Sequence, residues 1–83
     1  MKIQVFGTGC ARFDKLVENV NEAVRITDIN CTIEIVRDII EILNSGVPAT
    51  PALFIDGKMV CFGRLMSVEE ISTALEQSCL EAV

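Results

Sequence analysis

The sequence predicts an α/β domain of order β-α-β-α-β-β-α, in which a four-stranded mixed sheet carries helices on both faces. Three observations carry this prediction. Apolar residues alternate with polar ones in two early segments, recur every three to four positions in the helical segments, and flank an Asp56-Gly57 pair. Because Asp-Gly is a favoured two-residue hairpin turn, the last two strands pair antiparallel. The chain has 83 residues, so we expect a single domain over 1–83.

The first half of the chain supplies two strands and the helices that follow them. Alternation predicts strands over 1–6 and 31–36, and a long apolar stripe predicts a helix over 10–26. Asp38 is suited to cap a short helix over 39–43. Because a helix joins the two strands, we expect them to be parallel, with a right-handed crossover.

The second half supplies a hairpin and a final helix. We expect strands over 52–55 and 58–62, joined by the Asp-Gly turn. Ser67 is followed three residues later by Glu70, a pair that is typical of a capping box. The last helix therefore begins after Ser67.

Composition excludes several classes of function. The chain has 7 basic and 12 acidic residues and a net charge of −5, which argues against nucleic-acid binding and against binding to anionic membranes. No apolar run approaches the roughly 20 residues that span a membrane, and the N-terminus lacks the pattern of a signal peptide. We expect a soluble cytoplasmic protein without a membrane or nucleic-acid partner.

A single cysteine, Cys10, stands between the first strand and the first helix, with Gly7 and Gly9 just before it. The start of a helix carries unsatisfied N–H groups and a partial positive charge, which favour a thiolate over a thiol. Arg12 and Lys15 add positive charge if they point toward the sulfur. Cys10 is therefore the candidate nucleophile, and its alternative is a thiol without activity.

The chain resembles the thioredoxin superfamily, and within it the small glutaredoxin-like "redox-active disulfide" branch. The resemblance rests on the order of elements and on these segments: Gly7-Thr8-Gly9-Cys10-Ala11, Val47, Thr50-Pro51-Ala52-Leu53, Asp56-Gly57-Lys58, Gly63-Arg64 and Ser67-Val68-Glu69-Glu70. It implies thiol–disulfide exchange through Cys10 and a cis proline at Pro51. It also implies substrate contacts at Thr8, Gly9, Thr50 and Pro51.

The chain departs from this family at one important position. Members usually carry Cys-x-x-Cys, in which the second cysteine resolves the mixed disulfide. Here that position holds Phe13, which cannot do so. Cys61 is an alternative resolving thiol, because the hairpin turn pairs Ala52 with Cys61 and Leu53 with Val60 and so places Cys61 at the Pro51 end of the sheet. Its other interpretation is a small buried side chain.

The remaining cysteines indicate neither a disulfide framework nor a metal site. Cys31 and Cys79 fall on apolar stripes, so we interpret them as packing residues. There is no Cys-x-x-Cys pair and no histidine, which makes a structural zinc site unexpected. We expect no metal and no resident cofactor, with glutathione as a candidate co-substrate.

Three functions are open from the sequence. The first is a monothiol redox protein in which Cys10 attacks protein or small-molecule disulfides and an external thiol reductant resolves the product. A variant, a monothiol glutaredoxin sharing an iron–sulfur cluster, lacks its usual Cys-Gly-Phe-Ser. The second is a catalytically degenerate thioredoxin-fold module that holds an extended peptide beside Thr50 and Pro51. The third is a carrier of soft metal ions. We favour the first.

Overall fold

The computed structural model describes residues 1–9 and 11–81. The element bounds are β1 Lys2–Phe6, α1 Ala11–Thr27, β2 Thr32–Val36, α2 Ile39–Asn44, β3 Ala52–Ile55, β4 Lys58–Phe62 and α3 Val68–Glu81. The predicted order is confirmed, and each predicted boundary lies within one or two residues of the observed one. Of the helices described, none is both long and apolar enough to cross a membrane.

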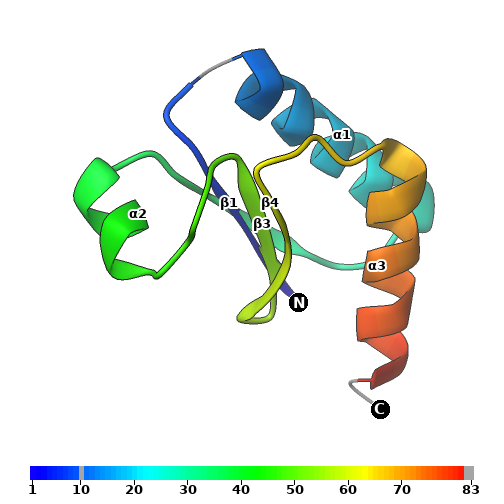
Figure 1. Ribbon diagram of the computed structural model, residues 1–83. Coiled ribbons are helices and arrows are strands. Elements are labelled where there is room, and N and C mark those ends of the chain that lie inside the picture. Colours follow the sequence, from blue (N-terminus) through cyan, green and yellow to red (C-terminus); the bar gives the residue numbers. More distant parts are fainter. Residues whose placement is uncertain (10, 82–83) are drawn as a thin grey trace.

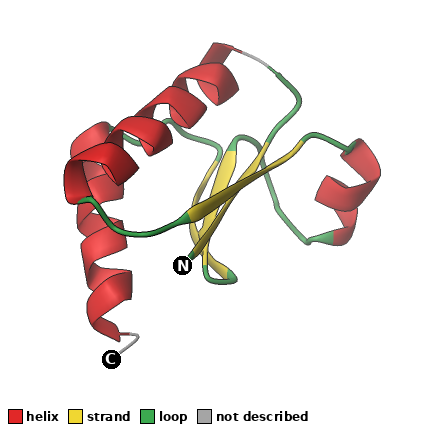
Figure 2. Cartoon of the chain, turned by 180° about the vertical axis from the view of Figure 1, so that it is seen from behind, coloured by secondary structure: helices red, strands yellow, loops and turns green. Residues whose placement is uncertain are grey.

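The four strands form one mixed sheet in the order β2-β1-β3-β4. β1 runs parallel to β2, with Ile3 opposite Ile33, and antiparallel to β3, with Val5 opposite Leu53. Helices α1 and α3 lie together on one face of the sheet and α2 lies on the other (Figures 1 and 2). The predicted α/β architecture with helices on both faces is therefore confirmed.

The two faces of the sheet are buried to very different extents. The larger core lies under α1 and α3 and contains Ile3, Val5, Phe13, Leu16, Val20, Ala23, Leu53, Ile55, Cys61, Met66, Ile71 and Leu75. The smaller core lies under α2 and contains Phe6, Val36, Ile42 and Ala52. Since α2 is only six residues long, one of its apolar side chains is buried and the others remain exposed. Most of the hydrophobic stabilisation therefore comes from the side of α1 and α3.

The β3–β4 hairpin corrects the predicted register. Asp56 and Gly57 have φ angles of 50° and 83°, as the predicted turn requires. A bulge after the first two pairs then makes Leu53 pair with Cys61 and Ala52 pair with Phe62. The predicted pairs Leu53 with Val60 and Ala52 with Cys61 are wrong, because one extra residue in β4 shifts everything beyond it.

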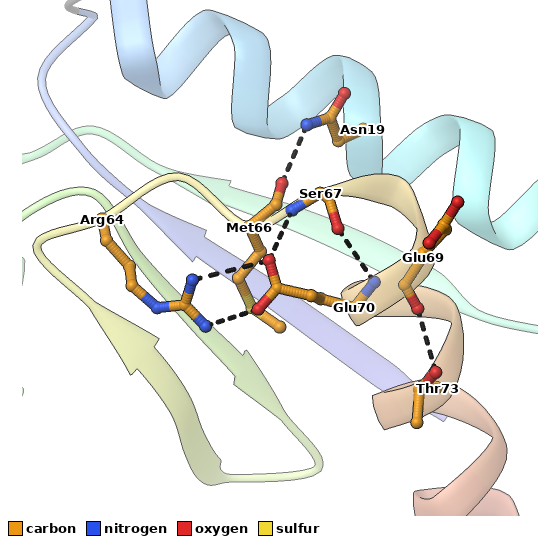
Figure 3. Close-up of polar contacts among 7 residues, drawn as sticks. All are labelled: Asn19, Arg64, Met66, Ser67, Glu69, Glu70 and Thr73. Atoms are coloured by element: carbon orange, nitrogen blue, oxygen red, sulfur yellow. Dashed lines mark hydrogen bonds and ion pairs between the residues drawn. The ribbon is translucent and has the colours of Figure 1, made fainter.

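The loop between β4 and α3 is fixed by polar contacts at both ends (Figure 3). The buried amide of Asn19, on α1, donates to the carbonyl oxygen of Met66 at 2.8 Å. The capping box is confirmed, because the Glu70 N–H donates to Ser67 Oγ and the Ser67 N–H donates to Glu70 Oε1, at 3.1 and 3.2 Å. The guanidinium of Arg64 also donates to the Glu70 carboxylate at 2.7 Å. These contacts hold the start of α3 against α1.

We expect Asn19→Ala to destabilise the protein by about 1–3 kcal/mol, because the Met66 carbonyl then loses its partner in a buried place. Urea unfolding at neutral pH measures this cost. Asn21→Ala is the matched control on the same helix, since the exposed Asn21 amide only donates to the Val17 carbonyl within α1. The control is expected to change stability by less than about 0.5 kcal/mol. Equal effects of the two substitutions would contradict the assignment.

Glu70 gives the protein a specific sensitivity to acid. The pKa of its carboxyl group is lowered from 4.5 to about 2, first by the hydrogen bond from Arg64 and then by the one from the Ser67 N–H. A carboxyl group with a lowered pKa in the folded state stabilises that state above its unfolded pKa. This contribution is lost as the pH falls from about 4.5 towards about 2.

We therefore expect the Glu70→Gln variant to lose less stability than the wild type when the pH is lowered. The measurement is the urea midpoint of the wild type and the variant from about pH 6 to about pH 2, where the difference between the two curves narrows as Glu70 is protonated. Glu69→Gln is the control, because Glu69 has no ion pair within the described residues. Parallel curves for wild type and Glu70→Gln would count against this assignment.

Candidate functional site

The segment after β1 turns sharply into α1. The Gly7 N–H donates to the Val36 carbonyl oxygen at 3.0 Å, so the chain leaves the sheet beside the end of β2. Thr8 and Gly9 are exposed, and Gly9 has a φ of 92°, which favours glycine. Cys10, the predicted nucleophile, lies outside the described residues, and α1 begins at the next residue, Ala11. The predicted site segment thus leads directly into the first turn of a 17-residue helix.

The side chain of Phe13 is fully buried in the larger core, in contact with the backbone of Gly7. A Cβ atom placed on Gly7 would lie only 2.2 Å from Cδ1 of the ring, far inside contact distance. Any side chain at position 7 therefore displaces the ring, and glycine is required there by close approach. Phe13 therefore lies on the buried face of α1.

Two arginines border the first turn of α1. Arg37, directly after β2, places its Cζ atom 5.4 Å from the centroid of the Phe13 ring, within the range of a cation–π contact. Arg12 donates from Nη1 to the Gly63 carbonyl oxygen at 3.5 Å. Lys15 instead forms an ion pair with Glu18 at 3.5 Å. The positive charge near this turn therefore comes from Arg12 and Arg37.

Arg37 was not among the site residues that were predicted from the sequence. A signal was available, because the residue that follows a parallel strand lies at the same edge of the sheet as the loop after its neighbouring strand. Phe6 pairs with Val36, so the residue after Val36 must lie beside Gly7.

The loop before β3 meets this segment because β1 and β3 are antiparallel. Phe6 pairs with Ala52, which places Pro51 next to the end of β1. The Thr50–Pro51 peptide bond is cis, the Pro51 side chain is buried, and Thr50 is exposed. The Gly63 N–H donates to the Pro51 carbonyl oxygen at 2.8 Å. The predicted substrate-binding residues Thr8, Gly9, Thr50 and Pro51 therefore lie on two loops at one end of the sheet.

Cys61 lies in the larger core. Its partner across the hairpin is Leu53, and its side chain is only 8% exposed. Burial raises the pKa of the Cys61 thiol, an effect that the positive charge of Arg64 partly offsets. A buried thiol with a raised pKa is a poor nucleophile, which disfavours Cys61 as a resolving thiol.

The other two cysteines differ from each other in exposure. Cys31 is half-buried against the larger core, and burial is the first cause of its raised pKa. Cys79 is exposed, so its interpretation as a buried packing residue is wrong. The last turns of α3 extend beyond the sheet (Figure 1). Within residues 1–9 and 11–81, no group of three or more His, Cys, Asp or Glu side chains is placed to hold a metal ion.

Comparison with known proteins gives a consistent family assignment. Residues 1–76 match the family model described as a thioredoxin domain. The chain is 41% identical over 75 residues to a protein named thioredoxin from Methanothermobacter thermautotrophicus, covering 90% of this chain and 97% of the relative. It is 39% identical over 74 residues to a thioredoxin from Methanocaldococcus jannaschii, covering 89% and 85%. Together with the mixed sheet and the arrangement of its helices, these matches show that the chain belongs to the thioredoxin domain family.

Proposed function

We propose that this protein performs thiol–disulfide exchange with Cys10 as its only active thiol. The observation that carries this proposal is the arrangement at one end of the sheet, where the first turn of α1, the Thr50–Pro51 loop and Gly63 meet. Membership of the thioredoxin family supports a thiol redox function in general. The sequence Cys10-Ala11-Arg12-Phe13 offers no second thiol at the usual spacing.

The exchange runs in two steps. The Cys10 thiolate attacks one sulfur of the substrate, the substrate S–S bond breaks, and the leaving thiolate departs with the electron pair and takes a proton from water. An external thiolate then attacks the mixed disulfide and releases Cys10 as a thiolate, while the external thiol becomes joined to the substrate. No metal or cofactor takes part. Glutathione or another small thiol serves as the external reductant, in a reducing compartment such as the cytoplasm.

The helix and the loops support each requirement of this reaction. α1 is 17 residues long, and the partial positive charge at its N-terminus lowers the pKa of a nearby thiol. Thr50 is exposed next to the buried Pro51, so its backbone is open to an extended substrate segment. An external thiol is needed because the side chain at position 13 is a buried phenyl ring and Cys61 is buried in the core.

A second candidate function is a peptide-binding module without turnover. The burial of Phe13 favours it to some degree, since the core is complete without a second cysteine. In this case the exposed Thr8 and Thr50 hold an extended peptide, and Cys10 behaves like an ordinary thiol. The reactivity of Cys10 separates the two functions.

We expect the rate of alkylation of Cys10 by iodoacetamide to rise with pH. The midpoint of this rise is expected at a pH below the pKa of free cysteine, which is roughly 8.5. Peptide mass spectrometry follows Cys10 separately from the other three cysteines, and Cys10→Ser is the control for the peptide assignment. Free N-acetylcysteine, alkylated under the same conditions, supplies the reference for an ordinary thiol. A midpoint at or above that of free cysteine would refute the monothiol enzyme and leave the binding module.

We expect Phe13→Cys to change the product of the reaction. After incubation with a small disulfide, the wild type retains the mixed disulfide on Cys10, whereas Phe13→Cys releases it and forms an intramolecular disulfide, as mass spectrometry detects. Phe13→Ala is the matched control, because it loses the ring without adding a thiol. Both substitutions are expected to destabilise the core by about 3–5 kcal/mol, so circular dichroism must first show folded protein. Release by the alanine variant would contradict the resolving function of position 13.

A further inference from the structure

The four arginines of the chain divide into two groups. Arg25 forms an ion pair with Glu22, and Arg64 forms an ion pair with Glu70 at 2.7 Å. Arg12 and Arg37 are exposed, and neither forms an ion pair with a carboxylate in the part of the chain that the structure describes. These two guanidinium groups are therefore open to an anion from outside the chain.

Both of these arginines lie against the first turn of α1. Arg12 belongs to that turn and reaches the Gly63 carbonyl, while Arg37 lies over the Phe13 ring from the end of β2. Cys10 is the residue immediately before α1. The two unpaired cations thus border the same helix start on two sides, one beside the Gly63 loop and one beside β2.

The neighbouring carboxylates do not neutralise this charge through ion pairs. The Asp38 carboxylate accepts hydrogen bonds from the Ile40 and Glu41 N–H groups at the start of α2. Asp14 is exposed on the first turn of α1 and forms no ion pair with a described residue. The N-terminal end of the α1 dipole adds further positive potential. Although the whole chain carries a net charge of −5, Arg12 and Arg37 therefore have no carboxylate partner at this end of the sheet among the described residues.

We propose that the region around the start of α1, with Arg12 on one side and Arg37 on the other, is an anion-binding subsite that selects disulfides carrying a carboxylate close to the sulfur–sulfur bond. The proposal rests on the proposed reaction of Cys10 and names its class of substrate. Guanidinium groups bind carboxylates through paired N–H donors, which gives direction as well as charge. In the exchange, the carboxylate remains bound while the Cys10 thiolate attacks the adjacent sulfur and the second sulfur leaves as a thiolate.

The charge of the subsite is measured with two alkylating reagents that differ in one group. Iodoacetate carries a carboxylate and iodoacetamide a neutral amide, and both react with Cys10 by the same substitution, in which iodide leaves. The ratio of the iodoacetate rate to the iodoacetamide rate, measured above the pH midpoint of Cys10 alkylation, reports the local electrostatic field. We expect Arg12→Gln/Arg37→Gln to lower this ratio about three- to tenfold at low salt, and less at high salt.

The matched control is Lys2→Gln/Arg25→Gln. It removes the same net charge, but from two side chains that are ion-paired with Glu34 and Glu22. All four side chains are exposed, so we expect every variant to fold, and urea unfolding verifies this. An unchanged ratio in Arg12→Gln/Arg37→Gln, or an equal fall in the control, would overturn the proposal.

Substrate preference provides the second readout. We expect the wild type to react faster with dithiodipropionate than with hydroxyethyl disulfide, and Arg12→Gln/Arg37→Gln to lose this preference. A pair of cystine peptides flanked by Glu or by Gln then distinguishes a polypeptide source of the carboxylate from a small molecule. If the wild type reacted at equal rates with the two small disulfides, and at equal rates with the two cystine peptides, the proposed subsite would be refuted. A pH midpoint of Cys10 alkylation at or above that of free cysteine would instead refute the proposed reaction. In that case the ratio of the iodoacetate rate to the iodoacetamide rate still tests whether Arg12 and Arg37 attract a carboxylate.

Discussion

The contact between the Phe13 ring and the backbone of Gly7 determines how α1 sits on the sheet. It joins the first turn of the helix to the end of the central strand, and only glycine leaves room for it. A buried phenylalanine contributes about 3–5 kcal/mol, whereas a domain of this size has a total stability of about 4–12 kcal/mol. The fold therefore depends on this ring, and the same ring occupies the position from which a second thiol would act.

Helix α1 is also held by the loop between β4 and α3. Asn19 contacts Met66, Arg12 contacts Gly63, and Gly63 in turn contacts Pro51. The loop between β4 and α3 is thus bonded to both the helix and the loop before β3. The loop on which Thr50 lies is therefore connected to α1 through Gly63.

Much of this arrangement could be predicted from local patterns. Alternation, helical spacing, the Asp-Gly turn and the Ser67–Glu70 capping box depend on neighbouring residues, and the structure agrees with all of them. The bulge that moved Cys61 to face Leu53 could not be predicted, since it depends on how β4 fits the whole sheet. Arg37 was missed although the parallel pairing of β1 with β2 places it beside Gly7, because its contact with Phe13 joins residues 24 positions apart in the sequence.

In the proposed reaction, the buried phenyl ring at position 13 changes what the site must recognise. A protein with two thiols resolves its own mixed disulfide, so that step does not depend on a partner. In the proposed reaction with one thiol, the substrate stays on Cys10 until an external thiol arrives, so substrate contacts away from the sulfur become more important. Since Arg12 and Arg37 have no carboxylate partner among the described residues, they are the groups suited to provide such contacts. In the proposed mechanism, Phe13 in place of a second thiol is therefore consistent with two arginines that have no carboxylate partner within residues 1–9 and 11–81.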